Sequence, residues 1–294
     1  MKNTKKLIAA MKVPPGRRVS LADYKTGWTG HFTDKHEADV LLQEGIERLA
    51  AQQERLYAED SYALLVIFQA MDAAGKDSTI KHVMRGVNPQ GCQVFSFKQP
   101  SSEERDHDYL WRSVKALPER GRIGIHNRSY YEEVLVARVD QAVLASEQLP
   151  KECRTGDIWS RRFRQINDFE RHLVENGIIV VKFYLNVSRK EQKKRLLERI
   201  EQPEKNWKFS LSDVKQRAFS KQYRHAYEDV LSRTSTKVAP WYVIPSDHKW
   251  FTRLAVSAVL VDTLERLDLH FPVLTKARRR ELQEARRLLM AEDD

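Results

Sequence analysis

Five short runs of apolar residues recur along this chain of 294 residues, and each has the length of a β-strand. They are SYALLVIFQA (61–70), CQVFSF (92–97), RIGIHN (122–127), IIVVKFYLNV (178–187) and WYVIP (241–245). Near-continuous apolar runs rich in Val, Ile and Leu are typical of strands that are buried on both faces, as in a parallel sheet. The pattern therefore predicts a five-stranded, mainly parallel sheet.

Between these runs, apolar residues recur three and four positions apart, which is the spacing of helices with one buried face. The predicted helices span about 37–56, 78–86, 102–117, 130–140, 158–175 and 189–201. Gly177 directly follows FERHLVEN and is typical of the end of a helix before the fourth strand. The alternation of strands and helices predicts an α/β fold with a doubly wound sheet flanked by helices.

Three segments break this alternation. Residues 1–40 are basic and polar and include Pro14-Pro15-Gly16, so we expect an extended N-terminal arm before a main domain at 41–272. Residues 188–235 contain two helical segments in series, joined by EQPEKNWKFS, with no strand between them. Residues 273–294 form a charged helix that we expect on the surface or at a subunit contact.

The composition limits the class of protein. Apolar residues make up 41% of the chain, which is enough for a folded core, and the formal net charge is +10. That charge indicates a polyanionic partner or simply a basic surface, and charge alone does not choose between them. Cys92 and Cys153 lack metal-site spacing, and no secretory signal or apolar run of about 18 residues is visible, so we expect a cytoplasmic protein.

The stretch QAMDAAGKDST (69–79) lies directly after the first predicted strand and leads into a predicted helix. Its Gly-Lys pair matches the end of the P-loop pattern G-x-x-x-x-G-K-[ST], in which backbone N–H groups at a helix start surround a phosphate. A tight turn with an exposed lysine is the alternative, but the order strand, glycine, lysine, helix favours the phosphate loop. The predicted phosphate-binding residues are Ala73, Ala74, Gly75, Lys76, Asp77 and Ser78.

Three residues of this stretch depart from the standard P-loop pattern. Ala70 stands where the first glycine is expected, so this position should avoid a positive φ. Asp77 replaces the usual Ser or Thr and could hold a hard cation directly or through water. Asp72 places a negative charge inside a phosphate site, which suits a residue that holds magnesium or orients the acceptor. Asp72 and Asp77 are therefore the candidate metal ligands.

The third predicted strand ends in Asn127-Arg128, at the sheet edge where ligands of parallel sheets bind. Arg128 can make a bidentate contact with a phosphate, although an exposed surface arginine would look the same. We expect His126 to pack in the strand rather than to act in catalysis. The guanine signature Asn-Lys-x-Asp does not occur, which argues against a GTPase.

An ordered set of segments resembles the polyphosphate kinase 2 family, the polyphosphate-dependent nucleotide phosphotransferases. The segments are 56–101, 108–112, 127–136, 164–173, 188–210 and 234–251, and they cover about 200 residues. The P-x-K-x-W-K motif at 203–208 makes the set specific. The resemblance implies a thymidylate-kinase-like P-loop core in which residues 188–235 form a helical lid.

The resemblance also implies roles for individual residues. Asp72, Lys76, Arg128 and Arg195 would be catalytic, with Arg195 as the lid arginine that closes over the transferring phosphates. Arg112, Asn127, Lys205 and Lys208 would bind nucleotide or polyphosphate, and we expect Trp207 to pack the lid. Asn127 is a weak candidate for a direct metal ligand, because it has no carboxylate.

The function implied is reversible transfer of the terminal phosphoryl group of inorganic polyphosphate to AMP or ADP with Mg²⁺, or with Mn²⁺ in its place. The segment NRSYYEEVLV (127–136) resembles members that accept both AMP and ADP, and guanine nucleotides stay open as acceptors. Family members are commonly dimers or tetramers, and no nucleic acid or membrane partner is expected. The alternatives are an ATP-dependent nucleoside monophosphate kinase and a basic, non-catalytic nucleic-acid-binding protein.

Overall fold

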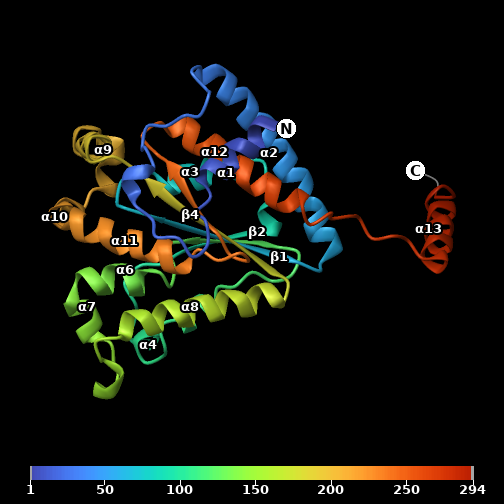
Figure 1. Ribbon diagram of the computed structural model, residues 1–294. Helices are drawn as coiled ribbons and strands as arrows, with labels where there is room; N and C mark the ends of the chain where they lie inside the picture. Colours follow the sequence, from blue (N-terminus) through green and yellow to red (C-terminus); the bar gives the residue numbers. More distant parts are fainter. Residues whose placement is uncertain (1, 293–294) are drawn as a thin grey trace.

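The computed structural model describes residues 2–292 and shows a twisted parallel sheet with helices on both faces (Figure 1). Its strands are β1 (Ala63–Ala70), β2 (Cys92–Ser96), β3 (Ile123–Asn127), β4 (Ile178–Asn186) and β5 (Trp241–Pro245). They lie in the order β2-β3-β1-β4-β5, and every neighbouring pair is parallel. The five strands predicted from the apolar runs are confirmed.

Thirteen α-helices lie within the described residues. They are α1 (Lys2–Met11), α2 (Lys35–Glu59), α3 (Lys76–Val83), α4 (Ser102–Arg105), α5 (Trp111–Val114), α6 (Glu132–Val139), α7 (Gln141–Ser146), α8 (Ile158–Glu175), α9 (Arg189–Glu201), α10 (Leu211–Gln216), α11 (Ser220–Thr234), α12 (Lys249–Glu265) and α13 (Lys276–Leu289). The single helix expected over 102–117 is wrong. The Asp108 carboxylate accepts a hydrogen bond from the Leu110 N–H, and this local turn separates α4 from α5.

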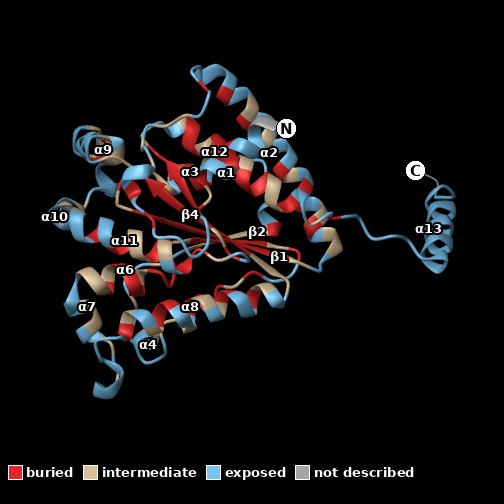
Figure 2. Ribbon diagram, viewed as in Figure 1, coloured by how far each residue is buried: buried red, intermediate tan, exposed pale blue. Residues whose placement is uncertain are grey.

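Alternate residues of β1 point into two separate hydrophobic cores. Leu64, Val66 and Phe68 pack into the core that also contains buried residues of α1, α2, α3 and α12. Leu65 and Ile67 pack into the core on the other face, under α6, α8 and α11. These two helical layers lie on opposite sides of the sheet in Figure 1, and β1, β3, β4 and β5 between them are largely buried (Figure 2). The edge strand β2 has no buried residue, so the burial on both faces that its apolar run predicted is wrong there. A strand covered on both faces has no polar side to mark its period, which explains the continuous apolar run in the sequence.

We had expected the N-terminal arm to be extended, but part of it is helical. Residues 2–11 form helix α1, and its Leu7, Ile8 and Met11 are buried in the core with α12. Lys12 then pairs antiparallel with Tyr242 of β5. The expected boundary at residue 40 also falls inside α2, which begins at Lys35. The apolar run of this helix is short and flanked by lysines, so the sequence did not indicate a buried helix here.

The segment between β4 and β5 is helical, as predicted, but it contains more elements than the two expected. α9, α10 and α11 are separated by 3₁₀ turns at Pro203–Lys208 and Arg217–Phe219. The charged helix expected near the end of the chain is α13. It projects away from the body in Figure 1, and all its residues are exposed (Figure 2). Between residues 2 and 292, no helix combines the length and apolar character needed to cross a bilayer.

Candidate active site

The phosphate loop leaves the central strand at the carboxyl edge of the sheet. β1 lies between β3 and β4, and crevices at such reversal points of strand order bind ligands in doubly wound folds. Gly75 adopts a φ of 106°, and the next residue begins α3. Ala70 is the last residue of β1 and avoids a positive φ, as predicted from its alanine. The second positive φ of the loop is at Ala73, at 61°. The loop thus accommodates alanine at its entry because the left-handed turn comes later.

Lys76 begins α3 and points back toward the end of β1. Its Nζ lies 3.4 Å from the Ala70 carbonyl oxygen, and no carboxylate among residues 2–292 forms an ion pair with it. Burial lowers the pKa of Lys76, and the nearby positive charge of Arg128 lowers it further. A cation in this position has charge available for an anionic ligand.

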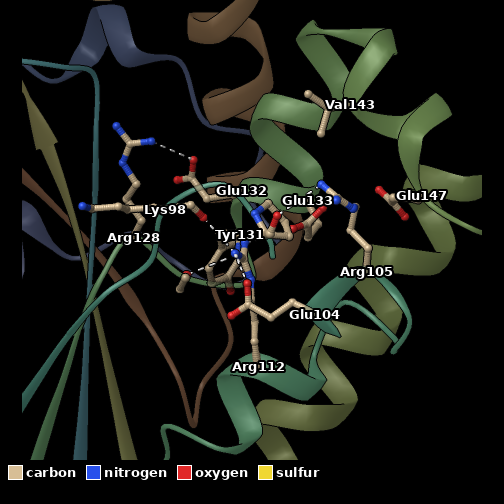
Figure 3. Close-up of polar contacts among 12 residues, drawn as sticks. Lys98, Glu104, Arg105, Arg112, Arg128, Tyr131, Glu132, Glu133, Val143 and Glu147 are labelled. Atoms are coloured by element: carbon tan, nitrogen blue, oxygen red, sulfur yellow. Dashed lines mark hydrogen bonds and ion pairs between the residues drawn. The ribbon is translucent and has the colours of Figure 1, made fainter. Parts of the chain in front are cut away.

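Arg128 follows β3 in a left-handed conformation, with a φ of 66°, and its N–H donates to the Phe68 carbonyl oxygen of β1 at 3.0 Å. Its guanidinium contacts Asp72 Oδ1 at 2.9 Å. It also lies 3.7 Å from Glu132 Oε2 (Figure 3). The structure therefore brings Asp72 and Arg128 together, as the sequence suggested. Glu132 was missed, although its position four residues after Arg128 in NRSYYEE was an available signal.

Asp77 and Asn127 also meet at this edge. The Asn127 side-chain amide donates to Asp77 Oδ1 at 2.7 Å, and it lies 3.4 Å from Ser96 Oγ of β2. Asp77 is exposed, and its partner here is a neutral amide rather than a cation. No group of three or more His, Cys, Asp or Glu suited to a metal occurs within the described part of the chain. Mg²⁺ is usually held by one or two carboxylates together with substrate phosphates, so Asp72 and Asp77 are a chemically suitable set.

Arg195 was expected to close over the transferring phosphates, but in this structure its guanidinium binds other parts of the protein. Only 5% of this residue is exposed, and its guanidinium donates to the carbonyl oxygen of Ala74 at 2.6 Å and to that of Ser246, after β5, at 2.6 Å. Its Nε pairs with Glu191 at 2.8 Å. Arg195 therefore holds α9, the first helix of the segment expected to form the lid, against the phosphate loop, and its donors already have partners.

A second side chain of α9 reinforces this contact. The buried Gln192 donates from Nε2 to the backbone oxygen of Asp72 at 2.9 Å and accepts from Arg217 at 2.6 Å. The lid thus contacts the loop through two side chains that bind backbone carbonyl groups. Sequence reasoning missed Gln192, because a glutamine between Glu191 and Lys193 on a highly charged helix gives no sign that it will be buried.

Arg112 lies in a different part of the edge, beside a cavity. Its guanidinium donates to the Lys98 carbonyl oxygen at 2.9 Å and to Glu133 Oε1 at 3.2 Å, and Glu104 lies 3.9 Å away (Figure 3). The cavity measures about 600 Å³, within the usual range for small-molecule sites. Its walls include Tyr109, Arg112, Glu133, Glu147, Arg161 and Arg162. Burial raises the pKa of Glu133 to about 7, and the charge of Glu147 adds to the effect.

The remaining candidates lie outside this constellation. Lys205 pairs with Glu198 at 3.6 Å, and the Lys208 ammonium lies 4.8 Å from the centre of the Trp207 ring. The expectation that Trp207 packs the lid is wrong, since 77% of it is exposed. His126 packs in β3 as expected: it is fully buried, and its Nε2 lies 3.0 Å from the Ala116 carbonyl oxygen.

Comparison with known proteins identifies the family of this chain. The family model described as polyphosphate kinase 2 (PPK2) matches residues 33–272. The chain belongs to the polyphosphate kinase 2 family. It is therefore a P-loop kinase-type α/β enzyme, a polyphosphate-dependent nucleotide kinase. The fold class and the family resemblance seen in the sequence are confirmed, and a non-catalytic nucleic-acid-binding protein is excluded.

Three similar proteins illustrate the match. An ADP-polyphosphate phosphotransferase of Rhodopseudomonas palustris is 49% identical over 280 residues, which are 95% of this chain and 97% of that protein. An AMP/ADP-polyphosphate phosphotransferase of Meiothermus ruber is 44% identical over 265 residues, covering 89% of this chain and 94% of its relative. The crystal structure of polyphosphate kinase 2 from Arthrobacter aurescens TC1 superposes with a TM-score of 0.83 at 39% identity, over 93% of this chain and 95% of the other.

Proposed function

We propose that this protein transfers the terminal phosphoryl group of inorganic polyphosphate to ADP, with AMP as a second acceptor, reversibly and with Mg²⁺. The observation that carries the proposal is the cation of Lys76, which has no carboxylate partner among the described residues and lies in the phosphate loop next to Arg128. The two relatives named above support the acceptors, because one is named for ADP and the other for AMP and ADP. Guanine nucleotides stay open as further acceptors.

In the proposed reaction, one P–O bond forms and another breaks. An ionised oxygen of the terminal phosphate of the acceptor forms a bond to the terminal phosphorus of polyphosphate. The bond from that phosphorus to its bridging oxygen breaks, and the shortened polyphosphate leaves with this oxygen and its electron pair. Because the attacking oxygen of ADP already carries negative charge at neutral pH, the reaction needs no residue to remove a proton. The protein contributes positioning and charge neutralisation.

Different residues provide the positioning and the charge neutralisation. Backbone N–H groups of the loop around Gly75 and Ser78 bind the transferring phosphate, and Lys76 and Arg128 neutralise its charge. Arg128 is paired with Asp72 at 2.9 Å, so a phosphate that binds Arg128 competes with this carboxylate. Asp72 then orients the acceptor or helps to hold the metal.

Asp77 is the stronger candidate to hold Mg²⁺, because its contact in the protein is a neutral amide whereas Asp72 faces a guanidinium. Mg²⁺, or Mn²⁺ in its place, would supply positive charge that offsets the charge of the phosphates. Arg195 supports catalysis by fixing the loop from the lid, and Lys205 and Lys208 remain candidates for contacts with the donor chain.

The acceptor and the donor occupy different sides of the loop in this proposal. The cavity beside Arg112 takes the nucleoside end of the acceptor, since it has a suitable volume and polar walls. Polyphosphate runs from the loop past the start of α3, where Arg253 of α12 donates to Ser78 Oγ at 3.2 Å.

A homo-oligomer, either dimer or tetramer, is also part of the proposal. The exposed side chains of Leu282, Leu288 and Leu289 on α13 would suit a contact between subunits. A cytoplasmic location stays a prediction from the sequence.

The test is to incubate the protein with polyphosphate and, in separate reactions, ADP, AMP, GDP or GMP, with and without Mg²⁺, and to separate the nucleotides by chromatography. We expect ATP from ADP, and ADP followed by ATP from AMP, only when both polyphosphate and the metal are present. If polyphosphate yields no higher nucleotide from any acceptor, the proposal is wrong. If ATP replaces polyphosphate as the required donor for AMP, the protein is instead an ordinary nucleoside monophosphate kinase.

A further inference from the structure

A buried polar cluster lies behind the active site, on the face of the sheet covered by α6, α8 and α11. Its centre is Lys182 of β4, which is fully buried together with Glu170 of α8. The Lys182 ammonium donates to Glu170 Oε2 at 2.5 Å, to Tyr131 Oη at 2.9 Å and to the Thr234 carbonyl oxygen at 2.7 Å. These three bonds use all three protons of the ammonium group.

Glu170 is bound just as completely. Its Oε1 accepts from the hydroxyl groups of Tyr130 at 2.9 Å and Tyr131 at 2.8 Å, while Oε2 accepts from Lys182. A buried ion pair of this kind is weak evidence for stability, because the desolvation of two charges offsets most of their attraction. Burial lowers the pKa of Lys182, which agrees with such a cost. The cluster therefore calls for a reason other than stability.

One side of the cluster reaches the catalytic arginine. Tyr131 is three residues after Arg128 and directly precedes α6, on the same turn as Glu132 and Glu133 (Figure 3). The turn between them is also fixed at Ser129, whose Oγ accepts from the Gln69 amide and from the Tyr131 N–H, each at 3.2 Å. Arg128 holds a φ of 66°, which a side chain with a Cβ adopts only when its surroundings impose it. The Tyr131 hydroxyl anchors the far end of that strained turn.

The other side of the cluster reaches the lid. Thr234 is the last residue of α11, the helix through which the lid returns to the sheet, and its carbonyl oxygen accepts from Lys182. The Thr234 hydroxyl also accepts from the Trp241 indole N–H at 2.9 Å, so the start of β5 is held at the same point. Carbonyl groups at a helix end lack partners within the helix, and Lys182 supplies one here.

We propose that Lys182, Glu170 and Tyr131 form a positioning unit for phosphoryl transfer, which fixes the turn that carries Arg128 and the base of the lid to one buried point. The inference rests on the role of Arg128 proposed above. Arg128 and the lid must both approach the same phosphates, and a shared anchor sets their relative position. Lys182 touches no substrate and acts through Arg128.

The test compares Tyr131→Phe with its neighbour Tyr130→Phe in the polyphosphate and ADP assay. Tyr131→Phe removes the hydroxyl that joins Lys182 to Glu170, whereas Tyr130→Phe removes a hydroxyl that binds Glu170 alone. For Tyr131→Phe we expect kcat to fall about tenfold or more, because small displacements of positioning groups have effects of up to about 100-fold. The KM for polyphosphate should stay within about a factor of two, and the loss for Tyr130→Phe should be clearly smaller.

A double-mutant cycle with Arg128→Ala separates positioning from general destabilisation. If Tyr131 acts through Arg128, Tyr131→Phe lowers kcat by less than about twofold once Arg128 is absent. Melting temperatures of all variants establish that they are folded. Should Tyr131→Phe fail to fold, the charge-neutral pair Lys182→Met with Glu170→Gln takes its place in the cycle.

The outcomes separate the two proposals. A folded Tyr131→Phe enzyme with the kcat of the unmodified protein would overturn the inference, and so would a loss of equal size with and without Arg128. An unmodified protein that makes no nucleotide from polyphosphate would instead overturn the proposed function, and the inference would fall with it.

Discussion

The phosphate loop and the lid carry their positive charges in opposite ways. In the loop, Lys76 has no carboxylate partner among the described residues, and its closest polar contact is a carbonyl oxygen at 3.4 Å. In the lid, Arg195 is buried, and its donors are bound to Glu191 and to carbonyl groups of the loop and of the segment after β5. In the proposed function, the Lys76 cation therefore serves the substrate, whereas the Arg195 cation holds parts of the protein together. The motif that contains a charged residue is thus not enough to assign its role. The groups that its donors already bind must also be known.

The largest effect that we expect on activity is from Lys76→Ala. Removing the cation that faces the transferring phosphate should lower kcat for ATP formation from polyphosphate and ADP by about 100- to 1,000-fold. Initial rates at saturating substrate, with thermal unfolding as a control, measure it. A folded Lys76→Ala protein that keeps most of its activity would break the comparison on the loop side.

A smaller effect tests the lid side. Gln192→Ala removes the amide that joins α9 to the Asp72 carbonyl group and to Arg217, and it should lower the free energy of unfolding by about 1–3 kcal/mol. Lys193→Ala is the matched control, because this neighbouring side chain on α9 is exposed. Urea unfolding of both variants gives the difference. Equal stabilities would mean that the contact between lid and loop contributes little.

Much of the loop side could be predicted from the sequence. A continuous apolar run, a Gly-Lys pair and a helix start are all local, so β1, the loop and α3 followed from residues 61–86 alone. Arg128 was predictable for a similar reason, because the ends of parallel strands meet at one edge of the sheet. Glu132 lay within the same motif and could have been included on its spacing.

The lid side could not be predicted to the same extent. Arg195 and Gln192 each bind backbone carbonyl groups more than 50 residues away, and a sequence does not show which backbone groups a side chain will bind. The packing of α1 on α12 was also missed, because it joins apolar side chains from opposite ends of the chain. The buried position of Lys182 also ran against expectation, since lysine in an apolar strand is rarely enclosed on all sides.

The most direct test of the contrast between loop and lid is the stability of two variants without any ligand. Arg195→Ala leaves Glu191 and several carbonyl groups without a partner, so it should lower the free energy of unfolding by about 2–4 kcal/mol. Lys76→Met should leave that free energy unchanged or raise it, since a cation without an acidic partner is costly to bury.

The expected stability of Lys76→Met relative to the unmodified protein depends on pH. The pKa of Lys76 is lower in the folded protein than its ordinary value of 10.5, so its charge weakens folding at neutral pH, and this cost disappears as the pH rises toward 10.5. Any advantage of Lys76→Met should therefore shrink in alkaline buffer. Urea unfolding of both variants and the unmodified protein, without nucleotide or polyphosphate, measures these free energies. The account predicts a destabilised Arg195→Ala and a Lys76→Met at least as stable as the unmodified protein, and the reverse order would contradict it.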